Sequence, residues 1–256
     1  MITSPDPHIN YQVNHGVFVL QINRPDKKNA LTQSMYAAMA EGIKSADQDG
    51  DIRVILITGV ENCFTSGNDV NDFVKAPEMG TERPSVQFMK AIAFANKPVI
   101  AAVGGMAIGI GTTMLLHCDL VYASEDAFLQ LPFTNLGLCP EAGSSLLLPQ
   151  IVGHQRASEL LLLGERFSAQ KAMDYGFVND VLPAAGYMEH AMNKAHHLAK
   201  LPADSVQTSK ALIKRNQATP MNETIQGELL QFARLLQSPE AQAIFQAFLN
   251  KKKYAS

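Results

Sequence analysis

The chain has 256 residues, of which 46% are hydrophobic and 18% are charged. This apolar fraction is ordinary for a globular protein and excludes an intrinsically disordered chain, while the length fits one large domain or one domain with an appendage. The formal net charge of −3 gives no electrostatic basis for binding nucleic acid or an anionic membrane surface.

The N-terminal part of the chain predicts a β-hairpin followed by a helix and a strand. Apolar segments at 11–13 and 17–23 flank Asn14-His15-Gly16, which is a hairpin turn sequence. Thr32 can cap a helix in which apolar residues recur at every fourth position. The continuous apolar run 54–58 is typical of a strand that is covered on both faces.

The segment 98–118 carries no charge and has the length of a membrane span. However, Gly104-Gly105 interrupts it, which favours a buried strand, a turn and a short helix over 112–117. A helix is expected before this segment, over 81–95, and a third buried strand after it, over 119–123. This repeated order of strands and helices predicts an α/β fold and no membrane association.

Beyond residue 140 the chain becomes mostly helical, with helical spacing in five segments before a final helix. We place a boundary near residue 200, which separates a core over 1–200 from a C-terminal helical region over 201–256. In the last helix an apolar stripe suits either a subunit contact or packing within the chain. The five segments are 153–163, 168–175, 184–201, 205–215 and 221–236, and the stripe is Ile244, Phe245, Phe248 and Leu249.

Several common functional motifs are incomplete or missing in the sequence. There is no GxxxxGK[ST] phosphate loop, no GxSxG nucleophile elbow and no HExxH metal site, and Gly109-Ile110-Gly111 does not complete GxGxxG. The cysteines Cys63, Cys118 and Cys139 show no CxxC spacing, so neither a disulfide framework nor a metal site is expected. Without a signal peptide or a C-terminal address, we expect a cytoplasmic protein.

Three segments together carry more information than any of these motifs. They are NRPDKKNAL at 23–31, FTSGNDV at 64–70 and PVIAAVGGMAIGIG at 98–111, the last followed by Cys118-Asp119. Their order and spacing resemble the crotonase superfamily, the enoyl-CoA hydratase and isomerase group. The resemblance covers nearly the whole chain.

The resemblance implies a crotonase-like ββα spiral core with a C-terminal helical region. It also implies an acyl-CoA substrate, with coenzyme A as part of that substrate and no separate cofactor. Members of the family form trimers or paired trimers, so a homotrimer or a dimer of trimers is expected.

Acyl-CoA chemistry next to a thioester passes through an enolate, whose oxygen backbone N–H groups can stabilise. Ser66 lies in a tight loop after a strand, and Ile110 begins a helix, where N–H groups are unpaired. With the resemblance, we predict that the Ser66 and Ile110 N–H groups form an oxyanion hole. Without it, the glycines around them would favour simple tight turns.

By resemblance, the CoA ester is expected to contact the first two segments and the helix start. Lys27 or Lys28 could also meet a CoA phosphate, although ordinary solvation of these side chains is equally open. The predicted CoA-ester contacts are Lys28, Ala30, Ser66, Gly67, Asn68, Asp69, Val70 and Ile110.

The acid–base residues distinguish the reactions within this family. Hydratases of the family place glutamates where this chain has Thr113 and Phe133, and neither side chain can activate water. Instead, Glu141 follows Pro140, and this Pro-Glu pair resembles the peroxisomal type of Δ3,Δ2-enoyl-CoA isomerase, as does Ser66-Gly-Asn-Asp69. Glu141 is therefore predicted to move a proton from C2 to C4.

Other interpretations of these residues stay open at this stage. Glu141 could be only a glutamate in the first turn of a helix, and burial and the helix dipole would shift its pKa in opposite directions. A hydratase is one alternative, and another crotonase-type reaction, such as dienoyl isomerisation or a hydrolase-like step, could use Asp69 or Asp72 as an additional carboxylate. A non-catalytic protein that binds CoA or a partner is the alternative outside enzymes.

Overall fold

The structure, a computed structural model, describes residues 3–75 and 80–253. The chain begins with the predicted hairpin, in which β1 (Ile9–Asn14) pairs with β2 (Val17–Ile22) in antiparallel register. Its two-residue loop, His15-Gly16, has positive φ at both positions, as a type I′ hairpin requires.

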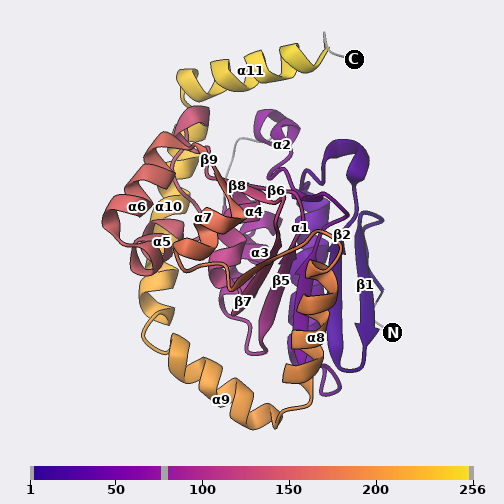
Figure 1. The fold of residues 1–256 in the computed structure, drawn as a ribbon. Helices are drawn as coiled ribbons and strands as arrows, with labels where there is room; N and C mark the ends of the chain where they lie inside the picture. The colour runs from indigo at the N-terminus through magenta and orange to yellow at the C-terminus, as the bar shows by residue number, and fades with distance from the viewer. Residues whose placement is uncertain (1–2, 76–79, 254–256) are drawn as a thin grey trace.

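The hairpin is one edge of a six-stranded sheet with the order β1-β2-β3-β5-β7-β10 (Figure 1). All neighbours after the hairpin are parallel, and the central strands β3 and β5 are buried at every position because both faces are covered. The added strands are β3 (Val54–Thr58), β5 (Val99–Val103), β7 (Leu120–Ser124) and β10 (Asp180–Leu182).

A second sheet consists of four strands that are three residues long, in the order β4-β6-β8-β9. Three successive segments, which begin at β3, β5 and β7, each add one strand to the large sheet and then one to this small sheet before a helix follows, as in β5-β6-α4. The resemblance predicted this ββα spiral. The small-sheet strands are β4 (Cys63–Thr65), β6 (Met106–Ile108), β8 (Phe128–Gln130) and β9 (Arg166–Ser168).

The large sheet separates two apolar cores. The main core lies between its inner face, the small sheet and the helices α1 and α3, and the other lies between its outer face and α8 (Figure 1). Thr32 caps α1 by accepting the Met35 N–H, as predicted. In chain order, the α-helices through α8 are α1 (Gln33–Gln48), α2 (Val70–Lys75), α3 (Pro84–Ala93), α4 (Ile110–Thr113), α5 (Ser144–Val152), α6 (His154–Ser158), α7 (Ala169–Asp174) and α8 (Tyr187–Ala199).

The C-terminal helices run along the edge of the core, with α11 above α2 (Figure 1). They are α9 (Ala203–Lys214), α10 (Ala218–Leu236) and α11 (Pro239–Lys253), and α10 packs on α5. In the predicted stripe Phe245 is fully buried and Ile244 is half-buried, while the Phe248 side chain lies outside the described residues. The predicted boundary near residue 200 falls between α8 and α9.

The charge-free segment 98–118 forms β5, a glycine turn, β6, α4 and the 3₁₀ helix η2 (Met114–His117), so the prediction of a buried strand, a turn and a helix is confirmed. Nowhere in the described part of the chain is a helix both long and apolar enough to cross a membrane. The remaining short elements are η1 (Pro25–Lys27), η3 (Thr134–Leu136) and the π-helical η4 (Glu159–Leu163).

Candidate functional site

Backbone hydrogen bonds join the loop around η1 to the loop between β4 and α2. The Leu31 N–H donates to the Gly67 carbonyl oxygen at 2.9 Å, and the Asp69 N–H donates to the Leu31 oxygen at 2.9 Å. The Ser66 N–H donates to the Lys28 oxygen at 3.0 Å. The two loops named by the resemblance are therefore one continuous wall.

Two side chains of the first segment reinforce this wall. Asn29 is fully buried, and its amide donates to the carbonyl oxygens of Ile22, Cys63 and Phe64 at 2.9–3.1 Å. Arg24 pairs with Asp69 at 2.8 Å, and both side chains are largely buried. The NRPDKKNAL and FTSGNDV segments therefore hold each other in place through their own hydrogen bonds and ion pair.

The start of α4 lies against the same wall. Gly67 has φ +90°, and a Cβ there would approach the Ile108 oxygen to 2.7 Å, while a Cβ on Gly111 would meet Thr65 Cγ2 at 2.6 Å. Because both glycines are needed for this close approach, the loop after β4 and the first turn of α4 are packed backbone to backbone.

The two loops present backbone donors with no acceptor among the described residues. Among them are the N–H groups of Asn68 and of Ile110, the first residue of α4. The prediction of the Ile110 N–H as a free donor agrees with this geometry. The prediction of the Ser66 N–H is wrong, because that N–H is already bonded to Lys28.

The donor after β4 therefore shifts to Asn68. Its backbone N–H stands between the two bonds that the neighbouring residues make with Leu31, and it has no partner in this ladder. Helix α4 adds the positive end of its peptide dipoles on the Ile110 side. Together the two N–H groups are suited to stabilise an oxygen that gains negative charge.

Glu141 lies beside this helix start, and only 6% of it is exposed. The Thr113 hydroxyl, one helical turn into α4, donates to its Oε1 at 3.2 Å. The alternative that Glu141 is only a glutamate in the first turn of a helix is wrong, since α5 begins at Ser144 and two residues in left-handed conformation, Ala142 and Gly143, intervene. This turn directs the carboxyl into the interior.

The surroundings of Glu141 also indicate the direction in which its pKa is shifted. Burial, and then the negative charge of Glu228, raise the pKa of Glu141 to about 8, and the hydrogen bond from Thr113 opposes the rise. A carboxyl with such a pKa can both accept and return a proton near neutral pH, as acid–base catalysis requires.

Asp69 and Asp72, the carboxylates that an alternative reaction could use, already accept hydrogen bonds within the protein. Although burial opposes it, hydrogen bonds from Arg24 and Asn71 hold the pKa of Asp69 below its usual value. Asp72 accepts the Gln33 N–H at 3.0 Å, which ties it to the start of α1. Phe133 is buried with only 4% exposure, so an apolar ring occupies the second hydratase position.

Three residues near Glu141 were not predicted. Tyr36 is fully buried on α1 and donates to Asn68 Oδ1 at 2.7 Å, and burial, then the charges of Glu141 and Asp72, raise its pKa. His117 and Glu228 both bind the turn after Glu141. No local sequence pattern marks them, because their contacts join residues far apart in the chain.

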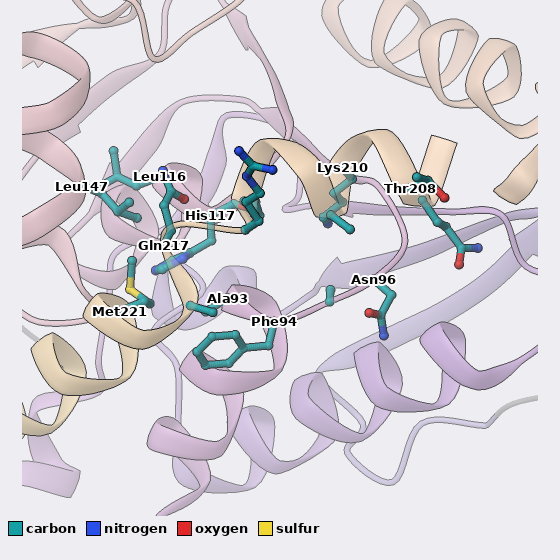
Figure 2. Close-up of a pocket in the computed structure, with 16 residues that line it drawn as sticks. Ala93, Phe94, Asn96, Leu116, His117, Leu147, Thr208, Lys210, Gln217 and Met221 are labelled. Carbon is teal, nitrogen blue, oxygen red and sulfur yellow. The ribbon is translucent and has the colours of Figure 1, made fainter. Parts of the chain in front are cut away.

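A pocket of about 410 Å³ lies behind the Glu141 turn (Figure 2). Figure 2 shows His117 and Met221 toward one end of it and Lys210 and Thr208 toward the other. The Ala142 oxygen accepts a hydrogen bond from His117 Nε2 at 2.6 Å, and burial lowers the His117 pKa to about 4, so the ring is neutral. This pocket is therefore next to the turn at Ala142 and Gly143, because His117 and Met221 line it and also contact that turn.

The predicted CoA contacts differ in exposure. Lys28 is exposed, Ala30, Ser66, Asn68, Asp69 and Val70 are half-buried, and Gly67 and Ile110 are buried, so the wall runs from the surface to the interior. Within the described ranges, no three histidine, cysteine, aspartate or glutamate side chains are grouped so that they could hold a metal ion.

Comparison with known proteins gives a consistent family. The family model described as enoyl-CoA hydratase/isomerase matches residues 12–255. The solved structure of OdaA from Pseudomonas aeruginosa superposes with a TM-score of 0.93 at 45% identity, covering 95% of this chain and 99% of that one.

Curated relatives include both isomerases and hydratases. Enoyl-CoA delta isomerase 2 of Rattus norvegicus is 32% identical over 93% of this chain, which spans 62% of that protein's length. From Escherichia coli, 1,2-epoxyphenylacetyl-CoA isomerase is 37% identical over 74% of this chain and 75% of its own length. The 2,3-dehydroadipyl-CoA hydratase of the same organism is 33% identical over 92% of this chain and 93% of its own length.

Proposed function

Since the chain belongs to the enoyl-CoA hydratase/isomerase family, we propose that it is an enoyl-CoA isomerase that moves a double bond from the Δ3 to the Δ2 position. The observation that carries this proposal is the buried Glu141 carboxyl, with its pKa raised to about 8, beside two free backbone donors.

The thioester oxygen of a 3-enoyl-CoA would accept hydrogen bonds from the Asn68 and Ile110 N–H groups. Glu141 would remove a proton from C2, breaking that C–H bond, and the electron pair would delocalise into a dienolate stabilised by the two donors. The same carboxyl would then deliver the proton to C4, which leaves the double bond between C2 and C3. One acid–base group is sufficient for this sequence.

The wall formed by the two joined loops supports the proposed place of the CoA ester. Its members range from exposed Lys28 to buried Gly67, so a long thioester substrate could lie along it with its reactive end at the helix start. Lys28 at the exposed end is suited to meet a phosphate as a point charge.

Hydration is the second candidate, because the chain is 33% identical to a hydratase over 92% of its length. Hydration needs a second carboxyl to hold and activate water. Thr113 and Phe133 occupy the positions implied for those carboxyls, and Thr113 instead donates to Glu141. The site therefore supports isomerisation better than hydration.

The experiment offers the purified protein a 3-enoyl-CoA and a 2-enoyl-CoA in parallel. Formation of the conjugated thioester is followed by its ultraviolet absorbance, and hydration by its loss and by chromatography. We expect the double-bond shift with little hydration. Robust hydration without a shift would contradict the proposal, and CoA binding without turnover would favour a non-catalytic binding protein.

A further inference from the structure

The turn that carries Glu141 has an unfavourable backbone. Ala142 has φ +57° and Gly143 has φ +72°, so two successive residues adopt the left-handed conformation, which is costly for alanine. Such a turn persists only where its surroundings hold it in place.

Helix α10 supplies most of that hold through the side chain of Glu228. Its Oε2 accepts the Gly143 N–H at 2.6 Å, and its Oε1 accepts the Ser145 N–H at 2.9 Å and the Ser145 hydroxyl at 2.5 Å. Gly143 has no side chain with which to cap α5, so Glu228 acts as the N-cap from a distant helix.

Other contacts complete the hold on the turn. Met221, two helical turns before Glu228 on α10, lies so close to Gly143 that a Cβ there would approach its Sδ to 2.3 Å. His117 of η2, whose Cε1 would lie 3.8 Å from the same Cβ, donates to the Ala142 oxygen. The turn is therefore held by contacts from both α10 and η2.

The charged groups around Glu228 define its electrostatic role. Glu141 and the Cys139 thiol face it from the loop, His117 is neutral on η2, and Arg234 lies further along α10. The three hydrogen bonds that the Glu228 carboxyl accepts favour its ionised form. Burial acts in the opposite direction and raises the pKa of Glu228. A negative charge at this place favours the protonated form of Glu141.

We propose that Glu228 is a positioning residue for the isomerisation. Its carboxylate holds the strained turn so that Glu141 faces the reacting carbons, and its charge stabilises Glu141 while that residue carries the proton from C2 to C4. This inference rests on the proposed function and extends it to a residue of helix α10.

The test compares Glu228→Gln with Glu223→Gln, which makes the same chemical change at an exposed site on the same helix. We expect Glu228→Gln to lower kcat by about tenfold with little change in KM, because the carboxyl of Glu141 is misplaced while the CoA wall is intact. We also expect the acidic limb of kcat/KM to move to lower pH by roughly half a unit or more. The control should match the wild type.

Glu228→Asp separates charge from geometry. It keeps the negative charge but is too short to make all three hydrogen bonds, so the acidic limb should stay near that of the wild type while kcat falls. Hydrogen exchange of the peptide over 139–148 gives a readout independent of activity, and it should be faster in both variants. Thermal unfolding of each variant shows whether the rest of the chain is folded.

The outcomes are distinguishable. A wild type that does not isomerise any 3-enoyl-CoA overturns the proposed function, and the inference about Glu228 with it. An active wild type together with a Glu228→Gln variant of unchanged kcat and unchanged pH profile overturns only the inference. If Glu228→Gln is slow but its pH profile and exchange are unchanged, the positioning role is wrong as well.

Discussion

The two halves of the candidate site are held in place by different means. The proposed oxyanion donors belong to loops that the spiral joins through backbone bonds, such as those between Leu31 and the loop after β4. Glu141 instead depends on a strained turn that side chains from η2 and α10 hold. The donors are therefore a property of the fold, whereas the base is a property of individual side chains. This fits a family whose relatives include both isomerases and hydratases.

The sharpest test removes the base and leaves the donors. Glu141→Gln keeps the shape of the side chain but cannot accept a proton, so we expect kcat to fall at least about a hundredfold. Binding of an acyl-CoA, measured by calorimetry, should change little because the two joined loops that we propose to bind the CoA ester are unchanged. A variant that kept full isomerase rate would remove Glu141 from the mechanism.

The second test disturbs the donors instead. In Gly67→Ala the new Cβ would approach the Ile108 oxygen to 2.7 Å at a φ of +90°, so the loop after β4 must shift. We expect a loss of about 1–3 kcal/mol in the free energy of unfolding and roughly tenfold in kcat. Gly80→Ala, where a Cβ meets nothing within 4 Å, is the matched control. Equal stability of the two variants would contradict the close packing of the loop on β6.

The pH dependence distinguishes the buried base from the rest of the molecule. Because the folded pKa of Glu141, about 8, lies above its unfolded value, the folded chain binds the extra proton between these values. Its contribution to stability is fully present below the unfolded pKa and is lost as pH rises toward 8. We expect Glu141→Gln to be more stable than the wild type at pH 9, by about 2 kcal/mol, and to show no such advantage near pH 4. Denaturant unfolding at both pH values measures the difference.

The smallest expected effect concerns the strained turn. Ala142→Gly should relieve the left-handed conformation at that position and stabilise the chain by up to about 1 kcal/mol. Activity should fall slightly, since the turn gains freedom and Glu141 is less well oriented. Chemical denaturation and kcat, measured together, test whether stability and activity change in opposite directions. A gain in both would show that the strain has no part in orienting Glu141.

The sequence predicted the elements whose signals are local. Apolar runs gave the central strands β3 and β5, and Thr32 gave the start of α1. The three-residue strands of the small sheet were not predicted, because such short segments have no periodicity of their own. The helix whose first turn was expected at Pro140 and Glu141 begins instead at Ser144, as α5, because Ala142 and Gly143 adopt the left-handed conformation before it.

In the candidate site, too, features with a local sequence signal were predicted and features that depend on long-range contacts were not. The resemblance located both loops and Glu141, but it assigned the donor after β4 to Ser66, because only the register with Leu31 shows which N–H is free. Glu228 gave no signal, since 85 residues separate it from Gly143 and the contact exists only in the folded chain. Long-range hydrogen bonds of this kind have no local pattern that a single sequence could display.

The distance along the chain between Glu228 and its partners also bears on how the protein folds. The bonds that join the η1 loop to the loop after β4 link residues within the first third of the chain, whereas the turn after Glu141 waits for α10. Closing a longer loop costs more entropy before its contacts form. We therefore expect the η1 loop and the loop after β4 to join before Glu228 forms its hydrogen bonds with the turn after Glu141. The reactive carboxyl would then be the last part of the site to reach its place on the way to the native state.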